Sequence, residues 1–163
     1  MENMVKYPSI SSIILCAGKS SRLKNYKKKS KVLIPLLNNK NSIDYNLDLL
    51  KNIKLRNVFV NTHRNSSEIK NYFKKYNLKN LIFSHEKKLL GTCGAVKKIK
   101  NKNLSDMLIV IYGDTICRVR LKNLIKFHIT NKSNFTIVSN LSKNIKNSGI
   151  IKIKQKNILS EFI

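Results

Sequence analysis

The segment 13–23 constrains the fold of this chain more than any other, because a short apolar run breaks there at Gly18 into a small, basic, hydroxyl-rich turn. The apolar run is typical of a buried parallel strand. Since Gly18 has no Cβ and the serines after it are small, the turn can bring backbone N–H groups close to a phosphate. Arg22 and, shortly after the turn, Lys31 add positive charge. The pattern predicts a strand that ends in a site for the phosphates of a nucleotide.

The turn fits neither of two common phosphate-binding motifs. A P-loop, which shares the Gly-Lys-Ser tail of this turn, requires a glycine where Ile13 stands. A dinucleotide fingerprint requires glycines at the positions of Ser20 and Leu23. Both motifs are therefore excluded, and the phosphate site has to be of another kind.

Apolar runs alternate with segments of helical periodicity along the chain. We expect strands over 10–17, 57–62, 80–85, 107–112, 134–140 and 149–154, and helices over 42–53, 65–77, 92–100 and 120–130. Near-continuous apolar strands joined by helices predict an α/β domain with a mostly parallel central sheet that is covered on both faces. Ligands on such sheets bind at the carboxyl ends of the strands, where Gly18 and Asp114 both stand. The 163 residues suffice for a single domain over 1–163.

The charge of the chain is strongly unbalanced, with 33 Lys and Arg residues against 8 Asp and Glu and a formal net charge of +25. Such a balance is typical of proteins that bind nucleic acid or anionic membranes. The basic residues are spread along the chain, however, and Lys, Asn and Ile supply 71 of 163 residues, as the codons of an AT-rich genome would impose. We therefore expect residual affinity for polyanions but no specific nucleic-acid partner.

The sequence indicates neither membrane insertion nor a disulfide framework. No apolar run approaches the length of a membrane-spanning helix, and residues 9–17 lack the flanks of a signal peptide, so we expect a cytoplasmic protein. Cys16, Cys93 and Cys117 are odd in number and lack the spacing of metal ligands. We expect all three to be buried thiols.

The turn at Gly18 resembles the opening of the sugar-phosphate nucleotidyltransferases, whose first strand ends in L-A-A-G-x-G-[ST]-R-L and is followed shortly by P-K-x-L-x-P. Cys16, Ser20 and Ser30 depart from this pattern. Ser20 also resembles the loop of molybdopterin-cofactor nucleotidyltransferases, but there the lysine follows the arginine much more closely. The residues that match the sugar-phosphate pattern are Leu15, Ala17, Gly18, Ser21, Arg22, Leu23, Lys31, Leu33 and Pro35.

Five later segments resemble the same family, in the family's order. They match an L-G-T-A-G-A-L loop, a V-x-N-G-D strand, the F-H that closes a helix, a G-V-V strand and the stretch before an E-K-P. In this chain they are residues 89–96, 109–115, 127–128, 149–151 and 158–162. The resemblance runs from about Ile13 to the last residue and implies a Rossmann-like three-layer α/β/α fold of the nucleotide-diphospho-sugar transferase type.

The resemblance also implies a reaction, in which a nucleoside triphosphate gives its nucleoside monophosphate to a sugar 1-phosphate and pyrophosphate leaves. Backbone N–H groups of the turn would hold the triphosphate, and Arg22 would stabilise the departing phosphates. Lys31 would bridge the α-phosphate and the sugar phosphate, and Asp114 would bind Mg²⁺. The implied nucleotide-binding residues are Ala17, Gly18, Lys19, Ser20, Ser21, Glu86, Gly91 and Thr92.

Some polar side chains keep two interpretations. Glu86 is either a substrate contact or half of a structural ion pair. His63 either faces the site or is a hydrogen-bonded structural residue, whereas we expect His85 and His128 to be structural.

Two departures from the family bear on activity. Arg118 and Arg120 stand where the family commonly has acidic residues that cap the following helix. The family also continues past its E-K-P into a segment that binds the sugar and supplies a second metal-binding aspartate, and the sequence stops at Ile163. We therefore expect a C-terminally truncated enzyme that binds nucleotide but turns over sugar 1-phosphate poorly. A non-catalytic nucleotide-binding homologue and a basic nucleic-acid-binding module are the alternatives.

Overall fold

The computed structural model describes residues 7–18, 29–102, 105–141, 149–154 and 158–162. Its contacts divide the chain into two units, Met1–Ile125 and Lys126–Ile163, and each is described by itself. The expectation of one domain over the whole chain stays a prediction. Among the described residues, no helix combines the length and the apolar character that crossing a membrane requires.

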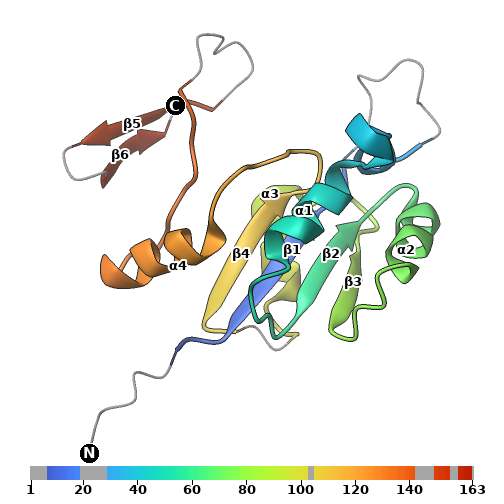
Figure 1. Ribbon diagram of the computed structural model, residues 1–163, viewed down its shortest axis with the longest axis horizontal. Helices are drawn as coiled ribbons and strands as arrows, with labels where there is room; N and C mark the ends of the chain where they lie inside the picture. The colour runs from blue at the N-terminus through green and yellow to red at the C-terminus, as the bar shows by residue number, and fades with distance from the viewer. Residues whose placement is uncertain (1–6, 19–28, 103–104, 142–148, 155–157, 163) are drawn as a thin grey trace, which may run out of the picture. The chain divides into compact units, whose positions relative to one another are not determined.

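The N-terminal unit contains a four-stranded sheet in the order β3-β2-β1-β4 (Figure 1). The strands are β1 Ile10–Leu15, β2 Val58–Thr62, β3 Leu81–His85 and β4 Met107–Tyr112, and neighbouring strands are all parallel. In the register of the sheet, Leu15 pairs with Asn61 on one side and with Tyr112 on the other. The carboxyl ends of three strands therefore meet at one edge, as the sequence predicts.

Helices cover both faces of this sheet. Successive residues of a strand point to opposite sides, so neighbouring residues of β1 contact different helices. Ile14 packs with residues of α1 Ser42–Leu50 and α2 Ser66–Lys74, whereas Ile13 packs on α3 Gly91–Ile99. Figure 1 shows α1 and α3 on opposite sides of β1. The prediction of a three-layer α/β/α arrangement around a parallel sheet is confirmed.

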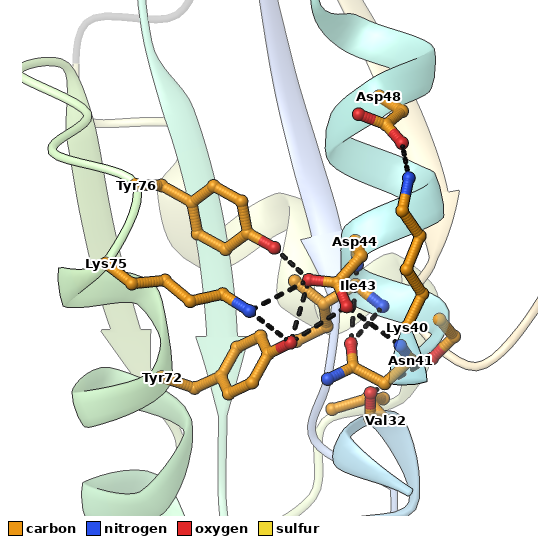
Figure 2. A network of polar contacts seen from close by, with 10 residues as sticks. Val32, Lys40, Asn41, Ile43, Asp44, Asp48, Tyr72, Lys75 and Tyr76 are labelled. Atoms are coloured by element: carbon orange, nitrogen blue, oxygen red, sulfur yellow. Dashed lines mark hydrogen bonds and ion pairs between the residues drawn. The ribbon is translucent and has the colours of Figure 1, made fainter. Parts of the chain in front are cut away.

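A polar network joins the two helices on one face (Figure 2). Asp44 of α1 closes a capping box with Asn41 and accepts hydrogen bonds from Tyr72 and Tyr76, while Lys75 Nζ lies 3.2 Å from its Oδ1. Burial alone would raise the pKa of Asp44, but the hydrogen bonds from the Asn41 N–H, Tyr72 and Lys75 outweigh it and lower the pKa below its usual value. The network fixes α1 against α2.

Short helical turns and a fourth helix complete the described helices. A 3-10 turn, η2 Lys31–Leu33, carries the predicted catalytic lysine, and η3 Leu37–Asn39 follows it. The fourth helix, α4 Leu121–Thr130, begins with a buried leucine that joins the core of the N-terminal unit.

In the C-terminal unit, the strands differ from those that the sequence predicts. Residues 134–140 form no strand, although their apolar residues predict one, because no neighbouring strand among the described residues offers them hydrogen bonds; Phe135 is 75% exposed. Instead, β5 Ile151–Lys154 and β6 Ile158–Phe162 pair antiparallel, and β6 was not predicted.

The prediction of three buried thiols is right only for Cys16. Cys93 is exposed and Cys117 is half-buried. In α3 the buried residues are Ala95 and Ile99, four positions apart on one side of the helix. Cys93 lies two positions before Ala95 and so points away from the sheet.

Candidate active site

A cavity of about 250 Å³ opens at the edge where β1, β2 and β4 end. Its lining comes from five stretches of the chain: the end of β1, the turn η2, the end of β2, the segment that follows β3, and the end of β4. The lining residues are Leu15, Cys16, Ala17, Gly18, Ser30, Lys31, Val32, Asn61, Glu86, Leu89, Gly91, Thr92, Tyr112 and Asp114.

Most of the residues that the sequence predicts for the site line this cavity. Arg22, Lys19, Ser20 and Ser21 lie outside the described residues, so their roles stay predictions. The predicted residues that the structure brings together are Ala17, Gly18, Lys31, Glu86, Gly91, Thr92 and Asp114.

The end of β1 is held in place by its neighbour strand. The Cys16 N–H donates to Asn61 Oδ1 over 2.6 Å, and Cys16 itself is buried. Burial, and secondarily the Asp114 carboxylate, raise the pKa of the Cys16 thiol, which is therefore neutral and no nucleophile. Gly18 is exposed, and a Cβ added to it would meet no described atom within 4 Å. Among the described residues, nothing fills the space beside Gly18.

Asp114 follows a glycine that packs tightly against β1. A Cβ on Gly113 would lie 2.6 Å from the Leu15 carbonyl oxygen, and the Gly113 N–H donates to that same oxygen. From the other side, the buried amide of Asn46 in α1 donates to the Gly113 carbonyl over 3.2 Å. These contacts fix the backbone just before Asp114, whose side chain lines the cavity.

Lys31 reaches Asp114, with Nζ 2.7 Å from Oδ2. The backbone on both sides of Lys31 is anchored by helices. The Ser30 N–H donates to Glu68 of α2 over 3.0 Å, and Ser42 of α1 donates to the Val32 carbonyl over 3.1 Å. These hydrogen bonds hold the turn η2, which carries Lys31.

The surroundings of Asp114 decide what kind of metal it could hold. Within the described residues, no group of three His, Cys, Asp or Glu side chains could enclose an ion. Two carboxylates of described residues line the cavity, and Glu86 already accepts from Asn61 and Leu90, which leaves Asp114. Such a donor set suits Mg²⁺, which is commonly held by one or two carboxylates together with phosphate oxygens and water. The donor set fits a metal that arrives with a nucleotide.

Glu86 lies under the other side of the cavity and is only 1% exposed. Its Oε1 accepts from the Asn61 side-chain amide over 2.9 Å, and its Oε2 accepts from the Leu90 N–H over 3.1 Å. The choice between a substrate contact and a structural ion pair therefore stays open. Among the described residues, no ion pair includes Glu86. Its carboxylate is instead held by an amide and a backbone N–H.

The histidines have structural partners. His63 Nδ1 lies 2.8 Å from the Glu86 carbonyl oxygen, and His85 Nδ1 lies 3.4 Å from Thr62 Oγ1. In the C-terminal unit, His128 Nδ1 lies 2.8 Å from Thr136 Oγ1. The hydrogen-bonded interpretation of His63 therefore holds in this structure.

The segment after β3 carries two of the predicted nucleotide-binding residues, Gly91 and Thr92. Gly91 has a φ of +69°, which residues with a Cβ rarely adopt, and it begins α3. Thr92 Oγ1 lies 3.4 Å from the Tyr112 hydroxyl of β4. The turn into α3 thus faces the end of β4 across the cavity.

Sequence reasoning missed three polar residues that support the site, namely Asn46, Asn61 and Glu68. Asn61 offered one signal, since it stands where the apolar run of β2 ends. Asn46 and Glu68 lie on helix faces, where polar residues are ordinary.

The family model described as nucleotidyl transferase matches residues 11–163. The chain belongs to this family. It is 29% identical over 145 residues to a protein assigned as a mannose-1-phosphate guanyltransferase from Sulfolobus acidocaldarius, covering 87% of this chain and 40% of that protein. It is 25% identical over 150 residues to a D-glycero-α-D-manno-heptose 1-phosphate guanylyltransferase from Aneurinibacillus thermoaerophilus, covering 91% and 65%.

Solved structures agree on the fold. The crystal structure of HddC from Yersinia pseudotuberculosis superimposes with a TM-score of 0.71 at 21% identity, covering 94% of this chain and 68% of that one. A Bacillus anthracis protein described as a glucose-1-phosphate thymidylyltransferase gives 0.77 at 18% identity, covering 94% and 63%. The resemblance that the sequence motifs indicate is confirmed at the level of family and fold.

Proposed function

We propose that this nucleotidyl transferase family member joins a nucleoside monophosphate, taken from a nucleoside triphosphate, to a sugar 1-phosphate and releases pyrophosphate. The observation that carries the proposal is the meeting of Gly18, Lys31 and Asp114 in one cavity at the carboxyl edge of the sheet. The relatives support it, because their names describe transfer of a nucleotidyl group to hexose or heptose 1-phosphates.

In the proposed reaction, an oxygen of the sugar 1-phosphate attacks the α-phosphorus. The bond from that phosphorus to the oxygen it shares with the β-phosphate breaks, and pyrophosphate leaves with the bonding electrons. The attacking phosphate is already ionised, so no general base is required. Catalysis then consists of positioning and of neutralising charge.

Lys31 is the residue we assign to that neutralisation, with its ammonium between the α-phosphate and the sugar phosphate. Asp114 would hold Mg²⁺, which supplies positive charge to the phosphate oxygens when bound. Because Lys31 and Asp114 compensate each other's charge without ligand, we infer that the ammonium moves to the phosphates as the carboxylate takes up the metal. Gly18 and the segment of Gly91 and Thr92 would receive the phosphates and the base.

A nucleotide-binding protein without transfer activity is the second candidate. One observation favours it. Of the two described carboxylates that line the cavity, Glu86 already accepts hydrogen bonds from Asn61 and Leu90, so only Asp114 is available for a metal. Two-metal transfer, by contrast, would use a second carboxylate.

The test combines nucleotide titration with a pyrophosphate-release assay. The panel pairs GTP, UTP, dTTP, CTP and ATP with hexose and heptose 1-phosphates, each with and without Mg²⁺. Lys31→Gln and Asp114→Asn should weaken nucleotide binding, and Asp114→Asn should remove its Mg²⁺ dependence. Pyrophosphate release supports the transferase, binding without release supports the second candidate, and absence of nucleotide binding refutes both.

A matched control exists elsewhere on the surface. Lys40 and Asp48 also form an ion pair of 2.7 Å with similar exposure, and neither lines the cavity. Lys40→Gln and Asp48→Asn therefore change the net charge equally and should leave nucleotide binding unchanged.

A further inference from the structure

Two buried side chains connect the opposite walls of the cavity. Asn61 Oδ1 accepts from the Cys16 N–H over 2.6 Å, and Asn61 Nδ2 donates to Glu86 Oε1 over 2.9 Å. Glu86 Oε2 then accepts from the Leu90 N–H over 3.1 Å. Asn61 is 4% exposed and Glu86 is 1% exposed. A continuous hydrogen-bonded chain thus runs from the end of β1 to the turn before α3.

The two N–H groups that end this series of hydrogen bonds fix which group donates and which accepts in each bond. Both ends are backbone N–H groups, which can only donate. Asn61 must therefore turn its oxygen toward Cys16 and its NH₂ toward Glu86. Glu86 must then accept on both oxygens, which a carboxylate can do and an amide cannot. The amide at 61 and the carboxylate at 86 are required as a pair.

The two ends of this series of hydrogen bonds, at Cys16 and Leu90, lie next to the ligand-facing residues. Cys16 comes two residues before Gly18, and Leu90 comes directly before Gly91. The Glu86 backbone is itself tied to β2, since its N–H donates to the Thr62 carbonyl over 2.7 Å. Movement of either wall therefore has to distort the same buried pair.

We propose that Asn61 is a positioning residue, which with Glu86 holds the phosphate-facing and base-facing walls of the cavity at the spacing that a nucleoside triphosphate needs. This inference rests on the proposed function, because it presumes that the cavity takes a nucleotide. It assigns Asn61 a role through its neighbours and without contact to the substrate. It also assigns Glu86 a role that needs its carboxylate only as an acceptor for Asn61 and Leu90.

The chemistry of the pair permits a swap. Asn61→Asp alone places two carboxylates against each other, and Glu86→Gln alone places two NH₂ donors against each other or against the Leu90 N–H. In the double variant Asn61→Asp with Glu86→Gln, the new carboxylate at position 61 accepts from Cys16 and from the new amide at position 86, whose oxygen accepts from Leu90. Every donor then has an acceptor, and the total charge equals that of the wild type.

The experiment measures thermal unfolding without ligand and the Kd of each nucleoside triphosphate for the wild type, both single variants and the double variant. We expect each single variant to unfold at a lower temperature and to bind its triphosphate about tenfold more weakly or worse. We expect the double variant to recover both quantities. Ser84→Ala, a buried change on β3 beside Asn61 whose hydroxyl has no partner among described atoms, should leave the Kd unchanged.

Recovery of the unfolding temperature without recovery of the Kd would overturn the inference, because Glu86 would then contact the nucleotide directly. Recovery of neither would overturn it as well, since the bond directions would be wrong. If a single variant fails to fold, the unfolding temperature and the Kd of the double variant are compared with those of the wild type, and that comparison decides. Failure of the proposed function is distinguishable from failure of this inference, because in that case the wild type itself would bind no nucleoside triphosphate.

Discussion

The ammonium of Lys31 and the carboxylate of Asp114 lie 2.7 Å apart, although the two residues are 83 positions apart in the sequence. Both are partly exposed to solvent, so the attraction between them is modest. Their nearness still matters for a ligand, because each group occupies the position that its proposed partner would need. A metal ion has to replace the lysine at Asp114, and a phosphate has to replace the aspartate at Lys31.

Lys31→Met should therefore strengthen metal binding to Asp114 in the absence of nucleotide. Removing the neighbouring cation leaves the carboxylate unopposed, and we expect Mn²⁺ affinity to rise by about two- to fivefold, as suits an exposed pair. The same variant should bind nucleoside triphosphate more weakly. Calorimetric titration with Mn²⁺ measures the first effect, and Lys40→Met controls for the lost charge. Equal Mn²⁺ affinity in Lys31→Met and the wild type would show that the pair does not compete with metal.

An added methyl group should destabilise the fold much more at Gly113 than at Gly18. Gly113→Ala forces a Cβ to within 2.6 Å of the Leu15 carbonyl oxygen and 2.9 Å of Cys16 Sγ, so we expect a loss of about 1–3 kcal/mol in the free energy of unfolding. Gly18→Ala meets no described atom and should cost less than about 0.5 kcal/mol. Urea denaturation separates the two variants, and equal losses would contradict the packing.

A bulkier change at Gly18 probes the ligand. Because the described protein leaves room beside Gly18, Gly18→Val should retain the fold and block the approach of a phosphate to the backbone. We expect a much larger Kd for nucleoside triphosphate with little change in urea stability. Unchanged affinity in this folded variant would remove Gly18 from the phosphate site.

The net charge of +25 predicts a second kind of binding that does not depend on the cavity. We expect duplex DNA to bind weakly, without preference for sequence, and to dissociate steeply between about 50 and about 200 mM salt. Fluorescence anisotropy with two unrelated duplexes across a salt series measures this. Tight or sequence-selective binding at physiological salt would favour the nucleic-acid alternative instead.

The sheet was predictable because its strands carry their own signal. The apolar run around Ile13 and the run of β2 around Phe59 are long enough to indicate buried parallel strands without any knowledge of partners. The same reasoning fails for 134–140, since a strand also needs a neighbour, and β-propensity supplies none. It also missed β6, whose residues are all exposed and lack a clear apolar run.

The site was predictable in its composition but not in its connections. Gly18, Lys31 and Asp114 could be found from local patterns, because each belongs to a short motif. The bonds of Asn61 depend on the register that places it beside Leu15, and Glu86 reaches it from the end of β3. Such pairings exist only after the strands are ordered, so no single segment of sequence reveals them.

Asp44 provides a prediction for acid stability (Figure 2). Its pKa in the native protein is below its usual value, because its hydrogen bonds to the Asn41 N–H, Tyr72 and Lys75 outweigh the opposing effect of burial. A carboxyl group with a lower pKa in the native than in the unfolded state stabilises the fold above its unfolded pKa of about 3.9. That stabilisation is lost as the pH falls through the lower native pKa.

We therefore expect the free energy of unfolding of the wild type to fall on acidification below about pH 4, and to fall less steeply in Asp44→Asn. At neutral pH, Asp44→Asn should already be less stable, because an amide cannot accept from Tyr72, Tyr76 and Lys75 as a carboxylate does. Urea denaturation at a series of pH values measures both effects. Asp48→Asn, which changes an exposed carboxylate of the same helix, serves as the control and should stay close to the wild type at neutral pH. Parallel pH curves for Asp44→Asn and the wild type would show that the network around Asp44 does not link α1 to α2 in the way its geometry indicates.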